Sequence, residues 1–298
     1  DYPSKPVRIV VPFAPGGGTD LSARVIAQKL TETLGANFVV DNRPGAAGIV
    51  GSEMIAKSKP DGYALLVASS SHAINPAMYD KLPYDTARDF APVSLLLSGP
   101  VLLVVHPSLP AKNARDVIAL AKAKPGTITF ASAGHGTPPH MAAELFKSMA
   151  GIDLIHVLYK GNGPAYTDLM AGQVLLMFPN IATAIQYVKT GRMRALGVGS
   201  KTRSTIAPEI PTIAESGLPG YQMSSWFGLL APAGTPPAIV NRLQQEIAKI
   251  FKQPEVREKL LAQGAEPVGN TPPEFAAFLA AETAQWTKVI KKAGIKPE

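Results

Sequence analysis

Three consecutive glycines near the start of the chain, Gly16 to Gly18, stand between an apolar stretch and a helix-like stretch. Residues 7–11 are mostly β-branched and predict a buried strand, and Thr19 or Asp20 is a suitable N-cap for the helix that follows. The first turn of such a helix presents free backbone N–H groups and partial positive charge at the carboxyl end of the strand. This arrangement can bind a carboxylate or a phosphate.

The glycine run alone does not separate a binding site from a plain turn, because glycine-rich turns are common connectors. It matches neither the dinucleotide fingerprint nor the P-loop. A second segment repeats the pattern: small residues from Ser132 lead to a helix with Thr137 as the expected N-cap and Pro138 in the first turn. A polar loop from Ser69 to Asn75 follows another expected strand, and its side chains are either ligand donors or ordinary loop residues.

The residue patterns that catalysis requires are mostly missing. There is no G-x-S-x-G elbow, no H-E-x-x-H motif and no cysteine. His135 and His140 are five residues apart without an apparent acidic neighbour, which predicts a capping or packing role rather than a metal site. His106 and His156 flank apolar strands and are expected to be satisfied polar groups. We therefore predict no catalytic residue, no cofactor and no metal.

Three further side chains have two interpretations each. Asp20 could act as a general base at the mouth of a cleft, but its place at a helix start favours capping. Trp226 and Phe227 are either core aromatics or residues that close over the apolar body of a ligand.

The composition narrows the class of protein. The 298 residues suffice for about two domains, and no apolar run approaches the length of a membrane span. A net charge of +7 favours anionic partners, but the basic residues are scattered, with Lys291 and Lys292 the only adjacent pair, so nucleic acid is not expected. The chain starts at Asp1, as an exported protein does after its signal peptide is removed, although any trimmed chain would start in the same way.

Alternating strand and helix patterns predict an α/β protein with parallel strands. Ser98-Gly99-Pro100 splits two apolar runs and suggests a crossing between domains, and the strand at 224–230 suggests the return. Three final helices, without a strand, must pack on the first sheet. We thus expect one lobe from residues 1–99 and 224–298, and a second lobe from residues 100–223. Further strands are expected at 37–40, 64–68, 93–97, 101–105, 127–131, 154–158, 174–178 and 194–198. Further helices are expected at 113–124, 237–252, 254–263 and 272–293.

Several motifs in this order resemble the Bug receptors, the extracytoplasmic solute-binding proteins of tripartite tricarboxylate transporters. The likeness runs from about Tyr2 to Lys296. The motifs are Pro12-Phe13-Ala14-Pro15-Gly16-Gly17-Gly18-Thr19-Asp20, Asn42-Arg43-Pro44-Gly45-Ala46, Pro60-Asp61-Gly62-Tyr63, the loop from Ala133 to His140, Tyr159-Lys160-Gly161, Pro211-Thr212-Ile213-Ala214-Glu215-Ser216-Gly217, Trp226-Phe227-Gly228 and Pro232-Ala233-Gly234-Thr235-Pro236.

The resemblance implies a type II periplasmic binding protein fold, in which two lobes close a cleft on the ligand. The loops 13–20 and 132–137 would hold one carboxylate, partly through backbone amides and bridging waters. The loop 69–75, Asn180 and the region 224–227 would meet the far end of the ligand. The residues implied as ligand-binding are Phe13, Pro15, Gly16, Gly17, Thr19, Asp20, Ser70, Ser71, Asn75, Ser132, Ala133, Gly134, Gly136, Thr137, His140, Asn180, Trp226 and Phe227.

The neutral amide of Asn180 argues against a cationic amine on the ligand, and so favours a di- or tricarboxylate, or an aromatic carboxylate, over an amino acid. The resemblance further implies a periplasmic, monomeric receptor that delivers its ligand to the membrane components of a tripartite tricarboxylate transporter. Two other functions fit the same cleft: a sensor that reports to a signalling partner, and a hydrolase or lyase.

Overall fold

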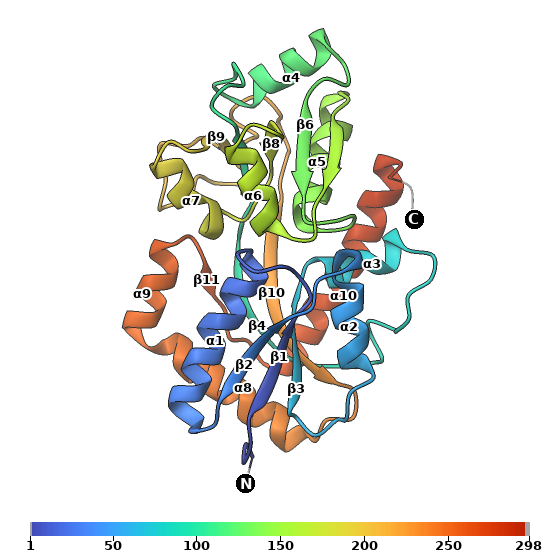
Figure 1. Cartoon of the computed structure of the whole chain (residues 1–298), viewed down its shortest axis with the longest axis vertical. Coiled ribbons are helices and arrows are strands. Elements are labelled where there is room, and N and C mark those ends of the chain that lie inside the picture. Colours follow the sequence, from blue (N-terminus) through green and yellow to red (C-terminus); the bar gives the residue numbers. More distant parts are fainter. Residues whose placement is uncertain (1, 296–298) are drawn as a thin grey trace.

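The computed structural model describes residues 2–295, in which two β-sheets lie one above the other along the long axis of the molecule (Figure 1). The first sheet has the order β11-β4-β10-β3-β1-β2 and the second the order β7-β6-β8-β5-β9. The first contains β1 (Val7–Val11), β2 (Phe38–Asn42), β3 (Ala64–Ser69), β4 (Phe90–Pro100), β10 (Ser224–Pro232) and β11 (Glu266–Pro267). The second contains β5 (Leu102–Val105), β6 (Thr129–Ser132), β7 (Ile155–Leu158), β8 (Leu176–Met177) and β9 (Arg194–Val198).

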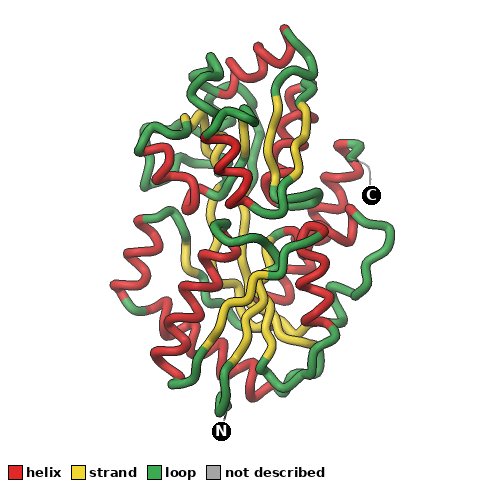
Figure 2. Tube along the Cα trace, in the orientation of Figure 1, coloured by secondary structure: helices red, strands yellow, loops and turns green. Residues whose placement is uncertain are grey.

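Helices cover both sheets (Figure 2), which confirms the predicted α/β class. With the first sheet lie α1 (Gly18–Leu34), the 3-10 turn η1 (Ala46–Gly48), α2 (Ile49–Ala56), α3 (Ser71–Met78), α8 (Pro237–Lys252), α9 (Pro254–Ala262) and α10 (Pro272–Ala293). With the second lie α4 (Ala114–Ala123), α5 (Pro138–Ala150), α6 (Asn162–Met170) and α7 (Ile181–Lys189).

Hydrophobic periodicity accounts for the first β-α unit. In β1 every residue but Arg8 is buried, as expected of a central strand covered on both faces. In α1 the buried positions Ala23, Ile26 and Leu30 recur at helical spacing, and they pack in the same core as β1. The parallel pairing of β1 with β2 and with β3 agrees with the prediction.

Two neighbouring antiparallel strands lead the chain between the sheets. At the upper end of this pair Pro100 of β4 faces Ser224 of β10, and β5 of the second sheet begins two residues after β4 ends. We propose that the lobes follow the two sheets, with the boundaries at 99/100 and 223/224. Residues 1 and 296–298 of the predicted ranges lie outside the described part of the chain.

The last helix does not pack on the first sheet alone, which corrects the prediction. Near its start, Phe275 lies in a core cluster with residues of β3 and β10. Near its end, Trp286 and Ile290 lie in the large core cluster of the second sheet, which includes residues of β5 and α5. As a result α10 spans both halves of the molecule (Figure 1).

Three other element predictions are wrong for physical reasons. Gly99 continues β4 because β10 pairs with it, so neighbouring strands override the expected break. The segment after β3 is a helix, α3, despite Pro76 inside it, because His72 to Asn75 are buried against the core. The final segment does contain a strand, β11, which adds two residues to the edge of the first sheet beside β4.

Helix α1 begins one residue earlier than Thr19. Its N-cap is Gly17, and no side chain makes the capping hydrogen bond there, so neither Thr19 nor Asp20 is the cap. Along residues 2–295, no helix combines the length and apolar character that a membrane crossing requires.

Candidate functional site

A narrow cavity lies where strands of both sheets lead into helices. Its empty space is about 390 Å³ including the mouth, and about 30 Å³ of this is open to the centre of a water molecule. It is lined by Phe13, Gly17, Thr19, Ser69, Ala133, Thr137, Pro138, Pro139, Asn162, Asn180, Ser225 and Phe227.

The amino ends of four helices meet at this cavity. Gly17 is the N-cap of α1 and Thr137 that of α5, Asn162 is the first residue of α6, and Asn180 is the N-cap of α7. Each helix start carries partial positive charge and backbone N–H groups without helical partners. Within the described residues the lining includes no charged side chain. The cavity is therefore electropositive without a formal countercharge.

The first wall comes from the β1–α1 loop and from β10. A Cβ on Gly18 would overlap the ring of Phe227, so glycine is needed for α1 to start against that ring. Phe227 is 7% exposed and forms an apolar wall beside Thr19. An apolar wall next to backbone donors suits a ligand with a charged end and a carbon chain.

Asp20 holds this loop in place. Its buried carboxylate accepts hydrogen bonds from the Gly16 amide (3.1 Å), Arg24 Nε (2.9 Å) and Asn42 Nδ2 (3.1 Å). Burial by itself raises the pKa of Asp20, but these hydrogen bonds and the Arg24 charge outweigh it, so the pKa is lowered overall. The carboxylate is ionised and fully engaged, and it does not line the cavity.

The second wall comes from the β6–α5 loop, which is held by neutral groups. Thr137 Oγ1 donates to the Gly134 carbonyl (2.6 Å), the Gly134 amide donates to Ser132 Oγ (3.1 Å), and the Gly136 amide donates to His140 Nδ1 (3.0 Å). Of these residues only Thr137 lines the cavity, together with Ala133. The others shape the loop.

At the far end, Asn180 joins the second sheet to the crossing strands. Its Oδ1 accepts the Ala182 amide (2.9 Å), and its Nδ2 donates to Ser225 Oγ (2.8 Å) and to the Gly99 carbonyl (3.4 Å). Both ends of the carboxamide are thus occupied by the protein. Asn180 contributes a neutral, pre-positioned surface to the cavity.

The two sides of the cavity contact each other on both flanks. On one flank the Ala14 amide donates to the Lys160 carbonyl (3.2 Å), and a Cβ on Gly163 would overlap the Pro15 carbonyl. On the other flank Tyr79 Oη donates to the His135 carbonyl (3.3 Å). The structure therefore represents a closed arrangement of the two halves.

Comparison with known proteins places the chain in a family. Residues 22–295 match the model of the tripartite tricarboxylate transporter family receptor. BugT of Bordetella pertussis is 39% identical over 99% of this chain and 91% of its own length. This chain belongs to that receptor family. The predicted resemblance to the Bug receptors is confirmed.

Solved structures of similar proteins confirm the type II binding-protein fold of this receptor. The R. palustris protein Rpa4515, solved with adipate, superposes with a TM-score of 0.97 at 38% identity and covers 100% of each chain. MatC from Rhodopseudomonas palustris, solved with bound malate, has a TM-score of 0.93 at 33% identity, with 97% of this chain and 100% of that chain covered. The chain is accordingly a solute-binding receptor.

Seven of the predicted site residues line the receptor's cavity: Phe13, Gly17, Thr19, Ala133, Thr137, Asn180 and Phe227. Eight lie directly behind the lining, in the loops or in α1, α3 and α5: Gly16, Asp20, Ser71, Asn75, Ser132, Gly134, Gly136 and His140. Pro15 lies at the flank, and Ser70 Oγ accepts the Trp226 amide (3.1 Å). Trp226 points to the other face of β10, where it packs against Phe275 and donates to Glu282 (2.8 Å).

Ser69 and Ser225, which also line the cavity, fall within the predicted ranges 69–75 and 224–227. The sequence analysis missed three lining residues of the receptor: Pro138, Pro139 and Asn162. Strand alternation explains why Ser225 lines the cavity together with Phe227, because side chains two residues apart share a face of the strand. Asn162 begins α6 after the turn that follows β7, so it belongs to the same strand-turn-helix pattern as the two glycine loops. Asn162 lines the cavity, and its buried Oδ1, like that of Asn75, has no hydrogen-bond partner among the described residues.

Proposed function

We propose that this receptor captures a small aliphatic dicarboxylate and delivers it to the membrane components of a tripartite tricarboxylate transporter. The observation that carries the proposal is the convergence of four helix starts on one cavity whose lining, among residues 2–295, has no charged side chain. Helix dipoles and oriented amides can replace the hydration shell of a carboxylate. A lysine or arginine in the cavity is then unnecessary.

The small volume and the lining of the cavity support a slender ligand. Only about 30 Å³ is open to the centre of a water molecule, and the apolar ring of Phe227 lies beside the polar helix starts. A linear chain with a carboxylate at each end suits such a space better than a bulky tricarboxylate or an aromatic ring. Two similar proteins, one solved with adipate and one with bound malate, support the same class.

The way in which the two halves meet supports a capture mechanism. Ligand that bridges the β1–α1 and β6–α5 loops adds to the contacts on the two flanks, so it shifts an open-closed equilibrium toward the closed form. A membrane partner can then recognise the closed form. We propose that this occurs in the periplasm and that the receptor acts as a monomer.

The proposal is tested by thermal unfolding of protein freed of co-purified ligand. The panel contains succinate, malate, adipate, citrate, glutamate, nicotinate and terephthalate, with butyrate as the matched monocarboxylate control. A ligand at a hundred times its Kd adds about 2.7 kcal/mol to the free energy of unfolding. We expect the large shift with an aliphatic dicarboxylate and none with butyrate.

Other outcomes identify what is wrong. A shift confined to terephthalate or citrate would overturn the aliphatic dicarboxylate while keeping carboxylate capture. No shift with any carboxylate would contradict the proposed function. A turnover product in any of the mixtures would show that the cleft is catalytic.

A further inference from the structure

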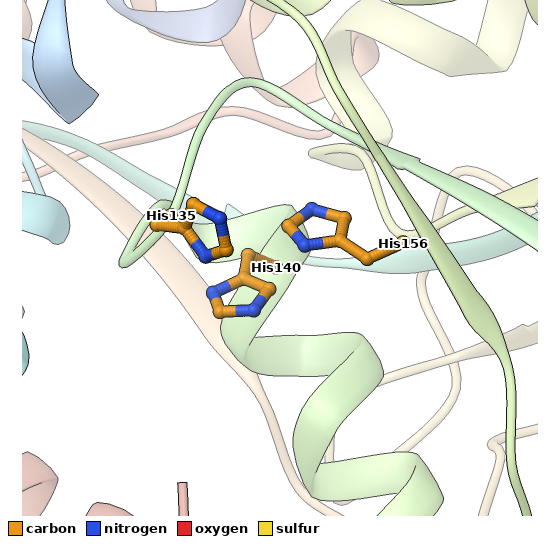
Figure 3. Close-up of side chains that lie close together, drawn as sticks. All are labelled: His135, His140 and His156. Carbon is orange, nitrogen blue, oxygen red and sulfur yellow. The ribbon is translucent and has the colours of Figure 1, made fainter. Parts of the chain in front are cut away.

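Three histidines from separate parts of the chain lie together behind the β6–α5 loop (Figure 3). His135 lies in the loop itself, His140 in the first turn of α5, and His156 on β7. One nitrogen from each ring lies within 4.8 Å of the other two. The sequence analysis considered only His135 and His140 as a pair of metal ligands. It did not include His156, which the pairing of β7 with β6 brings close to them.

We propose that this histidine cluster (His135, His140 and His156) binds one divalent transition-metal ion of the zinc type. Three imidazoles are a sufficient protein ligand set for zinc, with a fourth position left for water or another donor. Nitrogen donors favour zinc, copper, nickel and cobalt over magnesium and calcium, which prefer oxygen.

Hydrogen bonds around His156 leave one ring nitrogen available. Its Nε2 lies 2.6 Å from Ser132 Oγ, and Ser132 Oγ lies 3.2 Å from the Gly134 carbonyl. When Nε2 carries the proton and donates to Ser132, the Ser132 hydroxyl can donate to Gly134. Nδ1 then presents its lone pair to an ion, in the way that an outer hydrogen bond orients a metal-bound histidine.

The ring arrangement shows what binding requires. The rings of His140 and His156 are stacked, with centroids 4.4 Å apart and planes 9° apart, whereas His135 stands at 81° and 84° to them. Imidazole lone pairs lie in the ring plane, so one of the stacked rings must turn to share an ion with the other. If His140 turns, its Nδ1 releases the Gly136 amide. In that case metal binding also changes the loop that forms one wall of the cavity.

The charges around the cluster are balanced. Glu144 Oε1 lies 3.9 Å from His140 Nε2, and it forms an ion pair with Lys147 Nζ at 2.8 Å. His140 therefore does have an acidic neighbour, four residues along α5, contrary to the expectation from the sequence. The Glu144 carboxylate offsets the repulsion that Lys147 exerts on a cation and is a candidate fourth ligand.

The test is a titration of the full chain, without a polyhistidine tag, with Zn²⁺ followed by calorimetry and with Co²⁺ followed by visible absorption. We expect one ion per chain and a Co²⁺ spectrum of low-symmetry nitrogen coordination. His135→Gln and His156→Gln, at half-buried positions, should each weaken binding at least about tenfold. His106→Gln is the matched control, because His106 lies outside the cluster, where its Nδ1 forms a hydrogen bond with Ser108 Oγ.

Three results would overturn the proposal: no stoichiometric binding by the wild-type chain, no effect of either cluster variant, or an equal loss in His106→Gln. Melting curves of each variant establish that it is folded. Carboxylate binding is measured separately with the solute panel. Metal binding without carboxylate binding would contradict only the proposed function. Carboxylate binding without metal binding would contradict only the metal site.

Discussion

The two loops that form the cavity walls have the same design but are held by different chemistry. In each, a strand ends in small residues and a helix begins at the cavity, with Gly17 or Thr137 at the N-cap. The β1–α1 loop is fixed by the ionised carboxylate of Asp20, and the β6–α5 loop by neutral hydroxyl and imidazole groups.

In both loops, the residues that face the ligand differ from the residues that support the loop. Both loops offer the ligand backbone amides and small residues, whereas the titratable groups stand behind the lining. A substitution at the lining should therefore change affinity, and one behind it should change stability and its dependence on pH. The four predictions that follow test this division.

The largest effect is expected at the helix start of the first loop. Gly17→Asp places a carboxylate where the ligand's carboxylate would lie, and like charges this close cost several kcal/mol. Affinity for the best ligand of the panel should fall at least about 100-fold in calorimetry. Aspartate is a good N-cap, so the melting temperature should change little.

Gly17→Asn is the matched control for this variant. It has the same shape without the charge, and both variants must displace Asn162 slightly, because a Cβ at position 17 would lie 3.3 Å from that of Asn162. A far smaller loss with asparagine is expected. Equal losses would show that space, rather than charge, decides binding.

The next effect concerns the support of the first loop. Asp20→Ala removes the acceptor of the Gly16 amide and of Arg24 and Asn42. Hydrogen bonds to a charged group contribute about 1.5–3 kcal/mol, so the free energy of unfolding should fall by about this amount in a denaturant titration. Arg24→Ala, which removes a half-exposed partner, should cost less than about 1 kcal/mol. A similar cost for both would contradict the central place of Asp20.

A third prediction separates the loops by pH. Because the folded-state pKa of His140 lies below its unfolded value of about 6.5, the unfolded chain binds more protons as the pH falls below 6.5. The stability that the neutral imidazole contributes is complete above pH 6.5 and is progressively lost below it, by about 2 kcal/mol between pH 6.5 and 5. Asp20, whose pKa is also lowered, loses its contribution only below about pH 4.

Denaturant titrations at pH 7.5, 6 and 5 measure this difference. His140→Gln should reduce the decline between pH 6.5 and 5 by about 2 kcal/mol without abolishing it, because burial also lowers the pKa of His156 to about 3 and that of His72 to about 4. Asp20→Asn should leave the decline unchanged. A decline of the same steepness in His140→Gln would mean that other groups govern stability in this range.

The smallest effect is expected at the flank beside the second loop. Tyr79→Phe removes the hydroxyl that donates to the His135 carbonyl across the cavity. A single neutral hydrogen bond contributes about 0.5–1.5 kcal/mol, and this one is long at 3.3 Å, so we expect affinity to weaken about twofold to fivefold. An unchanged affinity would mean that this flank does not stabilise the closed form.

Local chemistry explains why much of the fold could be predicted. The bounds predicted for β9, α8 and α10 match the structure, because strand composition, Pro at the first helical turn and hydrophobic periodicity are properties of short segments. The two glycine loops were found for the same reason. Two α/β lobes joined by two crossings predicted that both loops border one cleft, and the family resemblance implied the same.

What could not be predicted depends on contacts between distant segments. The helix α3 forms despite Pro76 because its neighbours bury it. The histidine cluster needs β6 and β7 to pair, and the sequence does not specify that partner. Trp226 and Phe227 are adjacent in the chain, yet they serve a core and a cavity wall because a strand sends them to opposite faces.

The span of α10 across both halves gives the receptor a built-in optical signal. The chain has two tryptophans, and both indole nitrogens lie near Glu282 Oε2, Trp226 at 2.8 Å and Trp286 at 3.4 Å. One indole sits on a crossing strand and the other on the end of α10 that packs into the second core. Opening and closing should change the quenching of this pair, so intrinsic fluorescence can follow ligand capture in real time without a dye.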